Sequence, residues 1–249
     1  MKRITSLFRM ACMMALVILS TQPASAMHIM EGYLPMSWCV IWYVASLPFI
    51  FLSFLYLRRL VKRSPRSRIG LGLAGAFVFV LSALKLPSVT GSSSHLTGTT
   101  LGTVTVGPMA MPLLGLIVLL FQALLLAHGG LSTLGANIFS LAVAGPFVAY
   151  AIYTTLGKLK VNRNINLFVA TFCGTMATYI TTSFQLGIVY PDAQTGILGA
   201  AMKFLGIFAI TQVPLAILEG VITALVFSIL LKQGIEPVNM LIPEQEKNE

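Results

Sequence analysis

Long apolar segments separated by short polar breaks run through almost the whole chain. A helix that crosses a bilayer needs about 20 mostly apolar residues, and several of these segments reach that length. The pattern predicts seven helices, over residues 38–57, 69–86, 97–107, 112–127, 134–156, 166–189 and 207–231. The third has about 11 residues and would cover about half of the hydrocarbon core. It is either a full span or a half-span packed within the protein, where its backbone is sheltered from lipid.

Composition supports a membrane protein and excludes a soluble enzyme. Of the 249 residues, 57% are hydrophobic and 9% are charged, and the mean hydropathy is +0.89. Soluble domains have about 25% charged residues. The sequence thus predicts an all-α, polytopic membrane protein with one transmembrane domain over residues 27–249.

The first 26 residues have the three parts of a secretory signal peptide: a basic start, an apolar core and a small-residue cleavage site. These parts are Lys2, Arg3 and Arg9, residues 10–19, and Ala24-Ser25-Ala26. We expect residues 1–26 to be cleaved, which makes Met27 the mature N-terminus. The alternative is an uncleaved anchor helix, and both interpretations put Met27 on the outer face.

Basic residues predict the orientation of the chain in the membrane. Two clusters lie between predicted helices: Arg58, Arg59, Lys62, Arg63, Arg66 and Arg68, and then Lys158, Lys160 and Arg163. Since basic loops stay in the cytoplasm, both clusters should be cytoplasmic. The mature N-terminus is then outside an inner (plasma) membrane and the C-terminus inside. The net charge of +9 is explained by this orientation, so we do not expect nucleic-acid binding.

The chain has three histidines, and this topology puts all of them at the outer face. They are His28 at the mature N-terminus, His95 in a polar loop over residues 87–105, and His128 after the fourth predicted helix. Imidazole binds borderline transition-metal ions, so a group of histidines on one side predicts metal capture. The alternative is three unrelated polar residues near the interface.

His28 would be the second residue of the mature chain. The free amine of Met27, the amide nitrogen of His28 and its imidazole can form fused chelate rings around one ion. A nitrogen from His95 would complete a set of nitrogens that favours square-planar or tetragonal geometry. Zinc prefers tetrahedral geometry and fits this set less well. Glu31 is close enough in sequence to supply a carboxylate or to orient His28.

Three segments match a known family: Met27-His28-Ile29-Met30-Glu31-Gly32-Tyr33-Leu34-Pro35, Ser93-Ser94-His95-Leu96-Thr97-Gly98-Thr99, and Ala127-His128-Gly129-Gly130-Leu131-Ser132-Thr133-Leu134-Gly135-Ala136-Asn137. Over its whole mature length the chain resembles the CbiM family, the substrate-capture (S) components of cobalt energy-coupling-factor transporters. The resemblance implies an S-component-like helical bundle. It also implies that Met27, His28 and His95 bind Co²⁺ as the transported substrate and that His128 supports them without binding the ion.

The resemblance further implies partners: a transmembrane coupling component, an ABC-type ATPase and a small accessory membrane subunit, with the cobalt supplying cobalamin synthesis. The sequence agrees that the energy comes from elsewhere, since it has no GxxxxGK[ST] phosphate loop. We expect no enzymatic activity and no prosthetic group. Nickel is the alternative ion, because nickel-specific relatives share the Met-His start.

A self-sufficient secondary cation transporter is the competing class, and it would need acidic residues along a path through the membrane. An intramembrane hydrolase pairing Ser94 or Ser132 with a histidine would need a carboxylate to orient the base, and none is near in sequence. Glu219, near the middle of the last predicted helix, is the available acid. We expect it to be protonated or hydrogen-bonded to Gln212 or Gln185.

Overall fold

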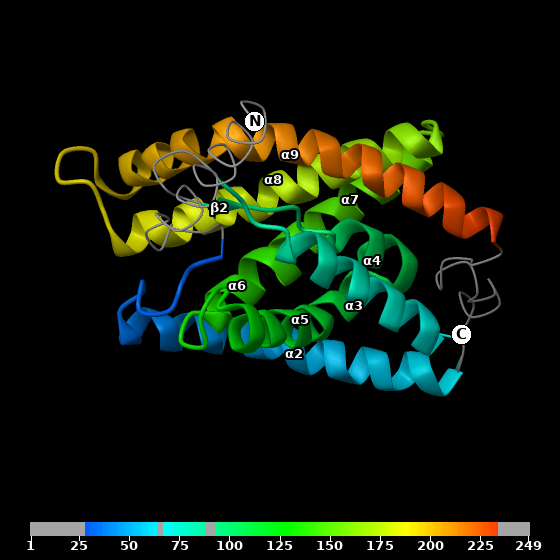
Figure 1. Ribbon diagram of the computed structural model, residues 1–249, viewed down its shortest axis with the longest axis horizontal. Coiled ribbons are helices and arrows are strands. Elements are labelled where there is room, and N and C mark those ends of the chain that lie inside the picture. The colour runs from blue at the N-terminus through cyan, green and yellow to red at the C-terminus, as the bar shows by residue number, and fades with distance from the viewer. Residues whose placement is uncertain (1–27, 64–66, 88–92, 234–249) are drawn as a thin grey trace, which may run out of the picture.

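The computed structural model describes residues 28–63, 67–87 and 93–233, and this part is almost entirely helical (Figure 1). Two strands of two residues each pair antiparallel where the chain leaves and re-enters the described part. In chain order the elements are α2 (Met36–Arg63), α3 (Ser67–Ala83), β1 (Leu86–Pro87), β2 (Ser93–Ser94), α4 (Thr99–Val106), the 3₁₀ turn η2 (Pro108–Ala110), α5 (Met111–Leu126), α6 (Leu134–Ile138), the π-helical η3 (Phe139–Ala144), α7 (Gly145–Lys158), α8 (Arg163–Val189) and α9 (Gly196–Lys232). The predicted all-α class is confirmed.

Each of the seven predicted segments contains a helix. Within the described residues, five helical stretches are long and apolar enough to cross a membrane: Met36–Arg63, Pro108–Leu126, Leu134–Lys158, Arg163–Val189 and Gly196–Lys232. α3 is a shorter apolar helix of 17 residues. α4 has eight residues, and all of them except Thr105 are buried. The predicted short third helix is therefore present, and of the two alternatives the structure has the one in which it packs within the protein.

The last helix differs most from its prediction. We expected it to begin near residue 207, but α9 begins at Gly196 and continues for 37 residues through Pro214. Three glycines (Gly196, Gly199 and Gly206) and Lys203 make the first part look like a loop in the sequence. Contacts with α8 stabilise this part as a helix. The two helices are so close that a Cβ on Gly187 of α8 would lie 2.9 Å from the backbone nitrogen of Ala201.

The helices form a bundle in which α8 and α9 lie side by side along one face and α2 lies along the opposite face (Figure 1). α4, α6 and α7 lie between them, and the α6–η3–α7 segment occupies the predicted fifth span as one helical stretch with a π-helical middle. α4 packs against α3 and α7, which gives the short helix its sheltered position.

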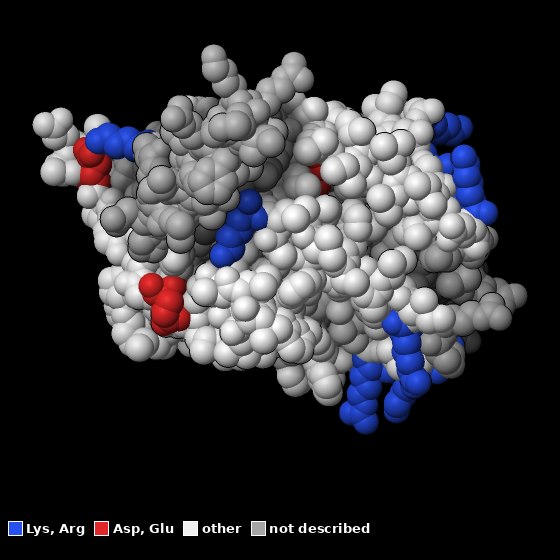
Figure 2. Space-filling model, viewed as in Figure 1, with Lys and Arg blue, Asp and Glu red and all other residues white. Residues whose placement is uncertain are grey.

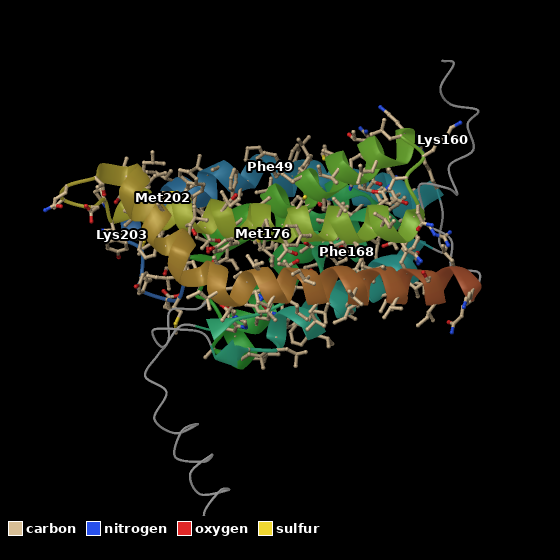
Figure 3. All side chains as sticks on the ribbon, turned by 90° about the horizontal axis from the view of Figure 1, so that it is seen from above. Phe49, Lys160, Phe168, Met176, Met202 and Lys203 are labelled. Atoms are coloured by element: carbon tan, nitrogen blue, oxygen red, sulfur yellow. The ribbon has the colours of Figure 1, made fainter. Side chains whose placement is uncertain are left out.

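The two ends of the bundle differ in charge. α2 ends in Lys62 and Arg63, and α7 and α9 end in Lys158 and Lys232. Figure 2 shows most of the visible Lys and Arg side chains toward one end, and Figure 3 shows Lys160 and Lys203 at opposite ends. His28 precedes the start of α2, so the histidines lie at the end opposite the basic clusters. The predicted segregation of basic and histidine residues is present in the fold.

Candidate metal centre

The structure brings the three histidines together, although they are far apart in sequence. His28 precedes α2, His95 follows β2, and His128 follows α5. Each contributes a ring nitrogen to a group whose ligand atoms all lie within 4.8 Å of one another. Their exposed fractions are 2%, 0% and 1%, so the group is shut off from solvent.

The rings are arranged around a common point. His28 and His95 are stacked with ring centroids 4.3 Å apart, and His128 stands edge-on to them at 4.6 and 5.0 Å. Nδ1 of His28 and Nε2 of His128 are 3.0 Å apart and share a hydrogen bond. Nδ1 of His95 donates to the carbonyl oxygen of Leu96 at 2.8 Å.

Each histidine keeps one buried ring nitrogen without a hydrogen-bond partner in the described part of the chain. These nitrogens are Nε2 of His28, Nε2 of His95 and Nδ1 of His128. Buried polar atoms are nearly always paired, because an unpaired one costs free energy. Three convergent imidazoles with free nitrogens fit a borderline transition-metal ion.

Burial also puts the histidines in the protonation state that binds metal. Loss of hydration lowers the pKa of His28 well below its ordinary value, that of His95 to about 4 and that of His128 to about 2. The positive charge of Lys85 lowers all three further. At neutral pH the imidazoles are therefore neutral and their lone pairs are available.

Asn137 at the end of the third matching segment fixes the backbone next to His28. Its side-chain oxygen accepts from the Ile29 amide at 2.8 Å, and its nitrogen donates to the Ile29 carbonyl at 3.0 Å. Thr133 donates to the same carbonyl at 2.6 Å. Asn137 of α6 thus binds both the N–H and the carbonyl of Ile29, which positions the neighbouring His28 side chain.

Two glycines after His128 allow the loop to touch this segment. Gly129 has a φ of +80°, which disfavours other residues. A Cβ on Gly130 would meet the backbone N and Cα of Glu31 at 2.5 Å. The His128 loop and the His28 segment are therefore in backbone contact.

Glu31 does not join the three histidines. Its exposed carboxylate accepts from the Ser132 amide at 2.9 Å, and interactions with Ser132 lower its pKa. It therefore ties the His128 loop to the N-terminal segment. Met27 lies outside the described residues, so the amine ligand stays a prediction.

Glu219 has different partners from those we expected. Its buried carboxylate accepts four hydrogen bonds: from the Thr97 amide (2.8 Å) and hydroxyl (2.6 Å), the Gly98 amide (2.7 Å) and the Thr175 hydroxyl (3.2 Å). The prediction of Gln212 or Gln185 was wrong, since Gln185 donates to the Ala136 carbonyl and the Gln212 amide has no partner among the described residues. The sequence signal was the carboxylate inside an apolar helix, but a contact across 122 positions cannot be read from one sequence.

Lys85 is a residue near the site that we did not predict. Its ammonium donates to the carbonyls of Leu126 and Ala127 at 3.3 and 3.4 Å, at the end of α5 and directly before His128. A basic residue at a helix C-terminus satisfies carbonyls that have no helical partner. It also brings a positive charge next to the histidine cluster.

The fold and the cluster together define a class: a multi-pass membrane protein with a buried group of three histidines whose ring nitrogens could hold a metal ion. Two solved structures share this fold. One, described as a truncated transition metal transporter, has a TM-score of 0.71 and 29% identity over 83% of this chain and 99% of that one. The other, described as a transition metal transporter, has a TM-score of 0.72 and 27% identity over 88% and 99%.

Sequence comparison identifies the family. The profile described as "Cobalt uptake substrate-specific transmembrane region" matches residues 28–236. The cobalt transport protein CbiM of Streptococcus sanguinis is 52% identical over 85% of this chain and 86% of its own length. That of Acetoanaerobium sticklandii is 56% identical over 87% and 89%. The chain belongs to the CbiM family, as the three sequence segments predicted.

Proposed function

We propose that this protein captures Co²⁺ with high affinity at the outer face of the bacterial inner membrane, as the substrate-specific component of an ATP-driven energy-coupling-factor importer. The observation that carries the proposal is the buried cluster of His28, His95 and His128 with one free nitrogen on each ring. Membership of a family of cobalt uptake proteins supports the choice of ion. Co²⁺ is the transported substrate, and no prosthetic group is involved.

In this proposal the ion binds the Met27 amine, the amide and imidazole nitrogens of His28, and the imidazole of His95. Only Nδ1 of His28 can close a chelate ring with the residue's own amide nitrogen, so the ion would take the place of the 3.0 Å hydrogen bond between this atom and Nε2 of His128. His128 would then support the site from beside the ligands. Burial supports tight capture, because neutral imidazoles bind without first losing a proton.

The orientation follows from the charge at the two ends. The basic end, with Lys62, Arg63 and Lys158, faces the cytoplasm, and the histidine end faces outward, as the positive-inside rule requires. A transmembrane coupling component, an ABC-type ATPase and a small accessory membrane subunit then drive uptake. The imported cobalt supplies cobalamin synthesis.

The first experiment is native mass spectrometry of the purified protein after exposure to equal Co²⁺ and Ni²⁺. We expect a chain that begins at Met27 and carries one cobalt ion. A cleaved chain that carries nickel would change the ion and keep the site, since Ni²⁺ also suits a planar nitrogen set. An uncleaved chain that binds equally well would exclude the amine as a ligand.

Substitutions test the ligands. We expect His28→Ala and His95→Ala each to abolish high-affinity binding, because each removes a buried imidazole from the proposed ligand set. Cys173→Ala, a partly buried position in α8, is the control and should bind as the wild type does. Tight binding by both histidine variants would contradict the assignment.

Reconstitution into vesicles distinguishes the ATP-driven importer from the competing secondary transporter. Glu219 is the available membrane acid, and its carboxylate already accepts four hydrogen bonds, which disfavours a role as an ion carrier. We expect cobalt uptake into vesicles only when the ATPase and coupling subunits are present. Uptake by this chain alone would favour the secondary transporter.

A further inference from the structure

Glu219 holds the loop that carries His95 through four hydrogen bonds. Two of them come from backbone N–H groups, which can only donate, and these reach both oxygens of the side chain. Three of the four donors belong to Thr97 and Gly98, two and three residues after His95. The fourth is Thr175 of α8, so the carboxylate also joins α8 to α9.

One peptide group connects Glu219 to the His95 ring. The N–H of the Leu96–Thr97 peptide donates to Oε2 of Glu219 at 2.8 Å. The carbonyl of the same peptide accepts from Nδ1 of His95, also at 2.8 Å. Carboxylate, peptide and imidazole therefore form one continuous chain of hydrogen bonds.

These hydrogen bonds determine which ring nitrogen of His95 is free. The proton must be on Nδ1 for the ring to donate to the Leu96 carbonyl, which leaves the lone pair on Nε2. Nε2 is the atom that is buried without a partner among the described residues. Hydrogen bonds in series polarise one another, so the carboxylate makes the Leu96 carbonyl a better acceptor and Nε2 a stronger metal ligand.

The loop has little freedom to move away from Glu219. Gly98, the N-cap residue directly before α4, has a φ of +68°, and a Cβ there would meet the Val78 Cα at 3.0 Å. A negative charge at this helix N-terminus is also favourable. On the other side of His95, Ser94 shares a 2.7 Å hydrogen bond with Thr211 of α9. α9 therefore holds the chain on both sides of His95.

We propose that Glu219 is a positioning residue for the metal centre: through the Leu96–Thr97 peptide it fixes the tautomer and orientation of His95 and strengthens Nε2 as a ligand. The role rests on the proposed function, since it concerns the affinity of the site for Co²⁺. Glu219 itself does not contact the ion. A metal-binding histidine is usually oriented by a carboxylate or by a backbone carbonyl, and here the two act in series.

The test compares wild type with Glu219→Gln, which keeps the shape but replaces an acceptor oxygen with a donor. Thr223→Val is the matched control, because Thr223 is buried one turn further along α9 and its hydroxyl has no partner among the described residues. The first readout is the ¹⁵N spectrum of histidine-labelled, metal-free protein, which reports the ring tautomer. The second is the Kd and visible absorption spectrum of bound Co²⁺.

We expect wild type and Thr223→Val to have His95 protonated on Nδ1. Glu219→Gln should show a mixture of tautomers, a Kd weakened by about 10- to 100-fold and shifted Co²⁺ absorption bands. Glu219→Asp, which keeps the charge, should recover part of the affinity. A wild-type His95 protonated on Nε2 would overturn the proposal without any variant, and so would a Glu219→Gln protein with unchanged tautomer, Kd and spectrum.

The failure of the proposed function gives a different result. Wild-type protein that binds no Co²⁺ would overturn cobalt capture, whereas the nitrogen spectra of the metal-free protein still decide how Glu219 positions His95.

Discussion

A single ammonium beside the histidine cluster opposes the binding of a cation. Lys85 donates to the carbonyl of Ala127, the neighbour of His128, and its charge lowers the pKa of all three histidines. The same repulsion acts on a bound divalent ion. We therefore expect the charge of Lys85 to limit the affinity of the histidine cluster for a divalent ion.

Removal of this charge should strengthen binding. We expect Lys85→Met to lower the Kd for Co²⁺ by about three- to tenfold at low salt and by less at high salt, because salt screens exposed charges. Competition with a chromophoric chelator measures both values. Lys85→Arg should resemble wild type, and Lys203→Met, which removes a lysine paired with Asp192, is the control. Unchanged or weaker binding by Lys85→Met would mean that its hydrogen bonds to α5 matter more than its charge.

The number of protons released on binding distinguishes the ligands. Since burial lowers the pKa of His95 to about 4 and that of His128 to about 2, these imidazoles release no proton at pH 7. In the proposed site, the Met27 amine, with an ordinary pKa of about 7.7–8.0, and the His28 amide would each lose one proton. We therefore expect about two protons per Co²⁺ near neutral pH, and affinity that falls as the pH falls, more steeply below about 4 as His95 becomes protonated.

Calorimetry in buffers of different ionisation enthalpy counts these protons. A chain extended by one residue before Met27 is the control, because its amine is displaced from the chelate ring and its affinity should be lower. Release of no protons by the wild type would instead indicate a site made of His28, His95 and His128 alone.

At the residue scale, contacts between residues far apart in sequence set the limit of what could be predicted. The topology put the three histidines on one face, and the fold confirms that they meet. The link from Glu219 to Thr97 could not be predicted, because a pattern along one chain contains no information on which distant side chains touch. Lys85 was overlooked because an isolated lysine after an apolar segment is typical of a membrane interface.

At the scale of elements, the metal centre depends on a backbone contact between the His128 loop and the N-terminal segment. A Cβ on Gly130 would lie 2.5 Å from backbone atoms of Glu31, which cannot rotate away as a side chain could. The two segments would have to separate, and His28 would move with its segment.

We expect Gly130→Ala to weaken Co²⁺ binding at least about tenfold, with little change in the thermal stability of the bundle. Gly72→Ala in α3 is the matched control, since a Cβ there meets nothing within 4 Å. Its affinity should equal that of wild type, as measured by the same competition assay. Wild-type affinity in Gly130→Ala would show that the loop adjusts without disturbing His28.

Helix existence could be predicted from hydropathy, whereas helix boundaries depended on neighbours. A short helix could be predicted over residues 97–107, because a segment of about 11 residues covers only about half of a bilayer. The start of α9 could not be predicted, because its glycines are poor helix formers in isolation. Contact with α8 stabilises this part of the helix. The π-helical η3 likewise has no signal in the hydropathy pattern.

At the scale of the whole molecule, the separation of charge predicts which end faces the cytoplasm. The loop between α7 and α8 contains Lys160 at the basic end, and the loop between α8 and α9 contains Gln194 near the other end. These loops lie at the two ends of α8, a helix of 27 residues. A membrane spanned by α8 therefore puts them on opposite sides.

Cysteines in these two loops report the orientation. In a Cys173→Ser background, we expect Gln194→Cys to react with a membrane-impermeant thiol reagent in intact cells, because it lies on the histidine side. Lys160→Cys should react only after the cells are permeabilised, since basic loops remain in the cytoplasm. The background protein controls for the buried Cys39, which should not react in either state. Labelling of Lys160→Cys alone in intact cells would invert the orientation, and the histidine cluster would then face the cytoplasm, where it could not capture an external ion.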